Sequence, residues 1–164
     1  MCGIAGYFDK SENSAGPIGA TVLNMLRALG SRGPDSAGVA LYRPPVDSNF
    51  LLQINLGENG HSQDTAENVV RKVSTLSKPK DISATGSYLR LTMDGTLNLD
   101  QVTAAIESAA SDVEVVSMGK RLEIVKQIGS PDRLEETFHL SGFKGSHGIG
   151  HTRMSTESKV DLSH

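Results

Sequence analysis

Hydrophobic residues recur at helical spacing in the segment PIGATVLNMLRAL, residues 17–29. The apolar positions that share one face of this helix are Ile18, Val22, Met25, Leu26 and Leu29. Pro17 suits the first turn of a helix, and Gly30 is a natural C-terminal stop. The segment 3–8, GIAGYF, predicts a short strand that is buried on both faces. AGVALYR, residues 37–43, predicts a second strand.

A different pattern fills the middle of the chain, residues 46–118. Strands are expected at 50–56, 86–93 and 112–118, and helices at 64–77 and from Asn98 or Asp100 to Ala110. This β-α-β-α-β order suits a small open sheet with helices on one face. Pro44-Pro45 and Gly119-Lys120 are plausible boundaries. We therefore expect an outer domain made of residues 1–45 and 119–164, and an inserted α/β lobe at 46–118.

The last third of the chain returns to the outer domain. RLEIVKQIG, residues 121–129, alternates as a strand does, and Ser130-Pro131 opens a helix in which Leu134 and Phe138 form an i,i+4 pair. GSHGIGHTRMSTES, residues 145–158, is a glycine-rich strand that runs into a loop.

Composition narrows the function classes. The chain has 164 residues, a formal net charge of −3 and a single cysteine, which rules out an internal disulfide and a cysteine-cluster metal site. The five histidines, at 61, 139, 147, 151 and 164, lack metal-ligand spacing. No basic stretch suggests a nucleic-acid or membrane surface, and no apolar run suggests a membrane span or signal peptide. We expect a cytoplasmic protein without a metal or cofactor of its own.

The only cysteine, Cys2, directly follows the initiator methionine. A thiolate is a strong nucleophile but needs a base to accept its proton. If Met1 is removed, the free α-amino group of Cys2 can be that base, because its pKa is close to 8. The alternative is a small hydrophobic cysteine in an edge strand.

Two further motifs carry candidate chemistry. RGPDSAG, residues 32–38, places the fixed cation Arg32 before a turn, where it could anchor a carbonyl group or lower the pKa of a thiol; a surface arginine beside a plain turn is the alternative. GHTRMSTES, residues 150–158, places Arg153 at a strand end, where its planar fork suits a carboxylate or a surface ion pair. Hydroxyl groups that could help to bind a small amino acid belong to Thr152, Ser155 and Thr156. His151 is equally consistent with a packed, hydrogen-bonded histidine.

MCGIAGYF, RGPDSAGVALY and GIGHTRMSTES, taken in this order, resemble class II glutamine amidotransferases, the N-terminal-nucleophile glutaminase domains. The resemblance covers the two ends of the chain, about half of its residues. It is greatest to glutaminase domains of the glutamate-synthase type, including the small subunits of glutamate-synthase-like and N-methylglutamate-synthase-like complexes. RGPD also resembles the glutaminase domain of asparagine synthetase, but no synthetase portion follows it here.

The resemblance implies an α+β fold, a four-layer αββα sandwich with two stacked antiparallel sheets, of which this chain would hold only a part. It also implies hydrolysis of glutamine to glutamate and ammonia. Cys2 would be the nucleophile, Arg153 would bind the α-carboxylate of glutamine with Thr156 nearby, and Arg32 and His151 would be supporting residues. Ammonia would pass to a partner synthase, and any flavin or iron–sulfur cluster would belong to partner subunits.

Several departures from the family pattern stand out. Met154 occupies a position that is often aromatic, and Ser155 one that is often alanine. The lobe at 46–118 replaces a much shorter connection, and either partner contact or simple bulk could be its role. The Asn-Gly pair that supplies the family's oxyanion hole, and a later aspartate that grips the substrate amine, have no counterpart after Arg153; Asn59-Gly60 lies in the inserted lobe.

These departures predict that the chain is an incomplete glutaminase domain. They also leave two other interpretations open. A non-catalytic regulatory or binding subunit could retain the start of the fold, and retention of Met1 would favour it. A different N-terminal-nucleophile hydrolase is the third interpretation, although an amino-acid carboxylate site at Arg153 argues against it.

Overall fold

The computed structural model describes residues 1–10, 16–44, 49–57 and 63–154. It divides into an outer unit, Met1–Pro44 with Arg121–His164, and an inserted unit, Pro45–Lys120. These boundaries lie within two residues of the expected ones. Both units combine helices with antiparallel strands, so the expected α+β class is confirmed at that level.

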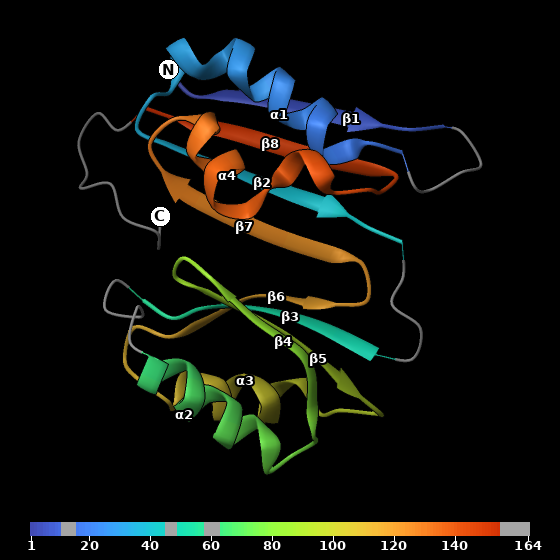
Figure 1. The fold of residues 1–164 in the computed structure, drawn as a ribbon, viewed down its shortest axis with the longest axis vertical. Coiled ribbons are helices and arrows are strands. Elements are labelled where there is room, and N and C mark those ends of the chain that lie inside the picture. The colour runs from blue at the N-terminus through green and yellow to red at the C-terminus, as the bar shows by residue number, and fades with distance from the viewer. Residues whose placement is uncertain (11–15, 45–48, 58–62, 155–164) are drawn as a thin grey trace. The chain divides into compact units, whose positions relative to one another are not determined.

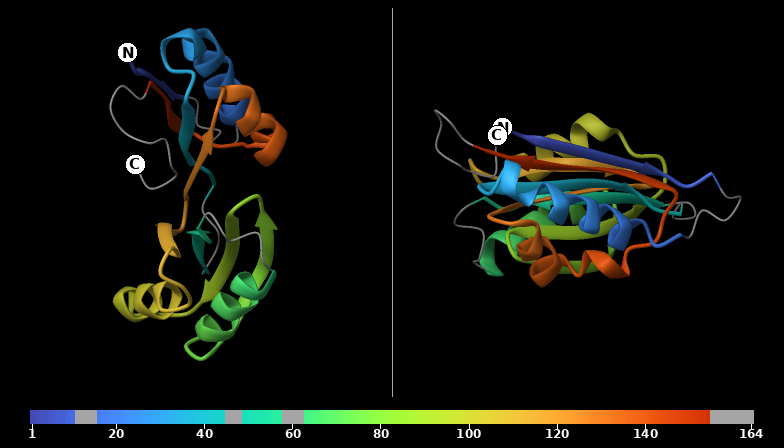
Figure 2. Two further views of the ribbon diagram at one scale, coloured as in Figure 1. Left: turned by 90° about the vertical axis from the view of Figure 1, so that its left-hand side faces the viewer. Right: turned by 90° about the horizontal axis from the view of Figure 1, so that it is seen from above.

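The described part of the outer unit contains one antiparallel sheet with the strand order β1-β8-β2-β7 (Figure 1). Its strands are β1 (Gly3–Phe8), β2 (Ser36–Tyr42), β7 (Leu122–Ile128) and β8 (His147–Arg153). Helices α1 (Ile18–Leu29) and α4 (Pro131–Phe138) lie on one face of this sheet, as Figure 2 shows from the side. Short 3-10 turns follow the helices at Gly30–Arg32 and Leu140–Gly142.

The apolar stripe of α1 packs against the glycine-rich strand β8. Ile18, Val22 and Leu26 are fully buried. A Cβ atom at Gly150 would lie 2.8 Å from the side chain of Leu26, so the glycine lets the helix approach the strand closely. The second helix also follows its sequence prediction, because Pro131 occupies its first turn and Leu134 is completely buried.

One local prediction for the outer unit is wrong, and a second is confirmed with an unexpected backbone geometry. Strand β1 is not buried on both faces: it lies at the edge of the sheet, and Ile4 and Phe8 are 74% and 61% exposed. Gly30 is the C-cap residue at which α1 ends, as predicted, but it is not in the left-handed conformation. Its φ of −57° is helical, and the chain continues for one 3-10 turn to Arg32.

The inserted unit has the order β-α-β-β-α-β rather than the expected β-α-β-α-β. Its elements are β3 (Asn49–Asn55), α2 (Gln63–Ser74), β4 (Pro79–Thr85), β5 (Tyr88–Asp94), α3 (Leu99–Glu107) and β6 (Glu114–Gly119). The antiparallel strand order β4-β5-β3-β6 makes it a ferredoxin-like split βαβ unit. The missed strand, β4, is exposed at every residue after Pro79, so it lacks the alternation that reveals a half-buried strand.

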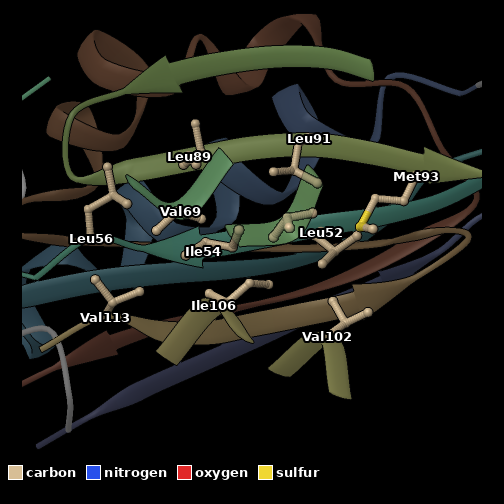
Figure 3. Packing of buried hydrophobic residues seen from close by; sticks show 11 residues of the cluster. Leu52, Ile54, Leu56, Val69, Leu89, Leu91, Met93, Val102, Ile106 and Val113 are labelled. Carbon is tan, nitrogen blue, oxygen red and sulfur yellow. The ribbon is translucent and has the colours of Figure 1, made fainter. Parts of the chain in front are cut away.

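Helices α2 and α3 cover one face of this second sheet (Figure 1). Figure 3 shows side chains of both helices, such as Val69 and Ile106, pointing toward Leu52, Ile54 and Leu91 of the strands. All five are fully buried. The inserted unit therefore has a hydrophobic core of its own.

The inserted unit connects two strands that are paired neighbours. Tyr42 at the end of β2 pairs with Leu122 at the start of β7. One residue farther, the Arg43 N–H group donates to the Arg121 carbonyl oxygen at 2.9 Å. The guanidinium of Arg43 also forms an ion pair with buried Glu123, at 2.9 Å. The insertion thus starts and ends at adjacent points of the outer unit.

Candidate active site

A cavity of about 540 Å³ lies in the outer unit. Cys2, His151 and Arg153 all line it, so the structure brings together three of the residues singled out from the sequence. Its remaining walls are formed by residues of the central and edge strands: Ser36, Ala37, Gly38, Val39, Ala40, Ile124, Lys126, Gln127, Ile149 and Gly150.

Strand alternation decides which side chains of β8 reach this cavity. Thr152 is fully buried, and its hydroxyl donates to the Leu29 carbonyl oxygen of α1 at 3.4 Å. Because successive side chains of a strand point to opposite faces, His151 and Arg153 point away from the helices. The expectation that the Thr152 hydroxyl helps to bind substrate is therefore wrong.

The pairing register places Cys2 beside Arg153. Gly3 pairs with Thr152, so the preceding residue, Cys2, comes level with Arg153. On the other side of β8, Arg153 pairs with Ser36. Cys2 is exposed and has no disulfide partner. A thiol, a guanidinium and a hydroxyl thus stand in one row across three adjacent strands.

The RGPDSAG turn supports the end of β8 through its backbone. A Cβ atom at Gly33 would lie 2.6 Å from the carbonyl carbon of Thr152, so only glycine fits there. The next turn residue, Asp35, donates its backbone N–H to the Arg153 carbonyl oxygen at 3.1 Å. The turn therefore fixes the backbone that carries the guanidinium.

Arg32 itself is exposed and does not line the cavity. Its expected support of the nucleophile remains a prediction. Thr156, the second expected substrate-binding residue, lies outside the described residues, as does Ser155.

Met1 and Met154 are in contact just before the start of β1. The α-ammonium group of Met1 donates to the Sδ atom of Met154 at 3.0 Å. Both side chains are exposed. Met154 therefore contacts Met1, the residue that precedes Cys2.

Two lining residues were missed by the motif analysis, namely Ser36 and Lys126. Ser36 falls inside RGPDSAG. The only signal for its place in the cavity was its position one residue before Ala37, which is buried, because neighbouring residues of a strand point to opposite faces. Lys126 lies in β7, in a strand that carries no recognised motif. Only the register, which pairs Lys126 with Gly38 and Gly38 with His151, reveals its place.

The described residues contain no group of three His, Cys, Asp or Glu side chains that could hold a metal ion. Within the same ranges, no helix is both long enough and apolar enough to span a membrane.

Two curated proteins are similar to the whole chain. A protein of Methanothermobacter thermautotrophicus, provisionally named a glutamine amidotransferase, is 34% identical over 170 aligned residues that cover 100% of this chain. Glutamine amidotransferase-like protein GlxB of Rhizobium meliloti is 30% identical over 168 aligned residues, which cover 98% of this chain. No family model matches the chain.

The chain spans about half the length of the curated relatives it matches, 55% and 52% respectively. The similarity runs through the inserted unit as well as through the outer unit, since the alignments cover all or nearly all of the chain.

Proposed function

We propose that the outer unit carries the glutaminase site of a class II glutamine amidotransferase and releases ammonia from the side-chain amide of glutamine. The observation that carries this proposal is the row formed by Cys2 and Arg153 in one cavity. The names of the two relatives support the same substrate.

In the proposed reaction, Sγ of Cys2 attacks the amide carbon of glutamine. The C–N bond breaks, ammonia leaves with the proton of the thiol, and a thioester remains. Water then adds to the thioester, the C–S bond breaks, and glutamate and the thiol are released. Removal of Met1 would free the α-amino group of Cys2 to carry the proton between these steps.

Arg153 is proposed to bind the α-carboxylate of the substrate. Its guanidinium can donate hydrogen bonds to both carboxylate oxygens in a bidentate pair, and its backbone is held by the turn at Gly33 and Asp35. Because Arg153 stands level with Cys2, a bound head group would keep the amide within reach of the sulfur.

We further propose that the outer unit belongs to an αββα sandwich and that the open face of its sheet is the inner face. Apolar side chains lie exposed there: Ile4 is 74% and Ile149 is 57% exposed. Ile4 pairs with His151, and Ile149 lies two residues before His151 in β8, so both share the face of His151. A second sheet would remove this surface from water. A cytoplasmic synthase partner that receives the ammonia completes the proposal.

Intact-mass analysis before and after treatment with a diazo-ketone analogue of glutamine tests the assignment. We expect loss of Met1 and one adduct, mapped to Cys2. The Cys2→Ser variant should show neither an adduct nor glutaminase activity. Retention of Met1 and an unmodified Cys2 would instead support the non-catalytic subunit that keeps the start of the fold.

A further inference from the structure

The lining of the cavity is electropositive. Among its described residues, Arg153 and Lys126 carry positive charge, and none is an aspartate or glutamate. Arg153 alone suffices for a bidentate carboxylate contact, so the second cation calls for its own explanation.

Lys126 lies on the edge strand β7, where a lysine side chain ordinarily extends into water. Here it leans inward. Lys126 pairs with Gly38 of β2, and its Cγ atom lies 3.2 Å from the position that a Cβ at Gly38 would occupy. The stem of the lysine therefore lies over the glycine, toward the middle of the sheet. The absence of a side chain at Gly38 makes this path available.

The register gives the distance that a ligand has to bridge. From Arg153, Lys126 is two strands across and two residues along, since Arg153 pairs with Ser36 and Ser36 with Ile128. With about 4.8 Å between strands and about 3.3 Å per residue, the two Cα atoms are about 12 Å apart. Two long side chains that lean toward each other can contact one carboxylate across that distance.

The same geometry keeps Lys126 away from the amide carbon that Cys2 would attack. Cys2 lies one strand beyond Arg153, on the side away from β7. Its Cα atom is therefore about 16 Å from that of Lys126. In extended glutamine, the amide carbon and the α-carboxylate carbon are about 5 Å apart. With the amide carbon at Cys2, the carboxylate end is the part that Lys126 can approach.

We propose that Lys126 is a second anchor for the α-carboxylate of the substrate, beside Arg153, and that it makes the site select amides with a free carboxylate. This inference rests on the proposed glutaminase function. Its test uses equilibrium binding to the Cys2→Ala protein, which needs no turnover. The probes are L-glutamate, which keeps the carboxylate, and glutaminamide, which lacks it.

The Lys126→Gln change should weaken glutamate binding about 10- to 100-fold, the value of one charge-assisted hydrogen bond. It should leave the weak binding of glutaminamide unchanged. Lys144→Gln is the matched control, because Lys144 is exposed and does not line the cavity. In the Cys2-containing protein, Lys126→Gln should raise KM for glutamine and leave kcat unaltered.

A glutamate affinity that Lys126→Gln does not change would overturn the inference and leave the proposed function standing. An equal loss for glutamate and glutaminamide would also overturn it, since a carboxylate anchor cannot affect a ligand without the carboxylate. If Cys2→Ala binds neither ligand, the proposed function fails together with the inference. A second variant, Gly38→Ala, should reproduce the glutamate-specific loss, because its Cβ displaces the lysine stem.

Discussion

Gly33 offers a direct test of how the turn holds the end of β8. A Cβ atom there would lie 2.6 Å from the carbonyl carbon of Thr152 and 2.7 Å from the backbone nitrogen of Arg153. Backbone atoms cannot rotate away as a flexible side chain can. The φ angle of Gly33, −155°, is extended and open to any residue, so the cost of Gly33→Ala is steric rather than conformational.

The magnitude follows from two contributions. Forcing one extra carbon into a packed contact typically costs about 1–3 kcal/mol. The turn must also move from β8, which endangers the hydrogen bond from the Asp35 N–H to the Arg153 carbonyl, worth about 0.5–1.5 kcal/mol. We therefore expect Gly33→Ala to lower the free energy of unfolding of the outer unit by about 2–4 kcal/mol.

Urea unfolding provides the measurement, with hydrogen exchange at the amides of β8 to separate the outer unit from the inserted one. Gly142→Ala is the control, because a Cβ at Gly142 meets nothing within 4 Å. If Gly33→Ala changes the unfolding free energy by no more than the Gly142→Ala control does, the close approach of the turn to β8 is refuted.

Three other changes test separate features. Arg153→Lys should raise KM for glutamine by at least tenfold, because an ammonium group cannot reproduce the bidentate fork. Asn98→Ala should destabilise the inserted unit by about 0.5–2 kcal/mol, since the Asn98 side chain accepts the Gln101 N–H at 3.1 Å and caps α3. Hydrogen bonds from Ser141 lower the pKa of Glu135, so this carboxylate stabilises the fold at neutral pH and the gain is lost as the pH falls through its folded-state value. Glu135→Gln should therefore reduce the fall in unfolding free energy that is measured as the pH is lowered.

Each of these three variants has a control variant, at a nearby residue, that should leave the measured property at its wild-type value. Arg133→Lys conserves an exposed cation outside the cavity, Gln101→Ala keeps the backbone donor of the cap, and Glu136→Gln removes an exposed carboxylate beside Glu135. Equal effects within any pair would contradict the specific contact on which that prediction depends.

Local sequence was sufficient for most elements of the outer unit. The apolar spacing of 17–29 predicted α1, and the Ser130-Pro131 start predicted α4, because both signals depend on residues within a few turns of each other. In the inserted unit, Asn98 is the cap of α3, one of the two candidates, Asn98 and Asp100, that the sequence offered. The exposed strand β4 was missed, since pairing with β5 rather than burial makes it a strand.

In the candidate site, too, local sequence determined some features and the tertiary structure decided the others. The sequence by itself determined that Cys2 carries a potentially nucleophilic thiol and Arg153 a guanidinium suited to a carboxylate, and that residues two apart in a strand share a face. It could not tell which face of β8 the helices cover, so Thr152 was assigned to the wrong side. Nor could it place Lys126 near the cavity. Only the tertiary structure decided these points, because the register of strands distant in sequence is set by long-range hydrogen bonds and by the helices that bury one face of the sheet.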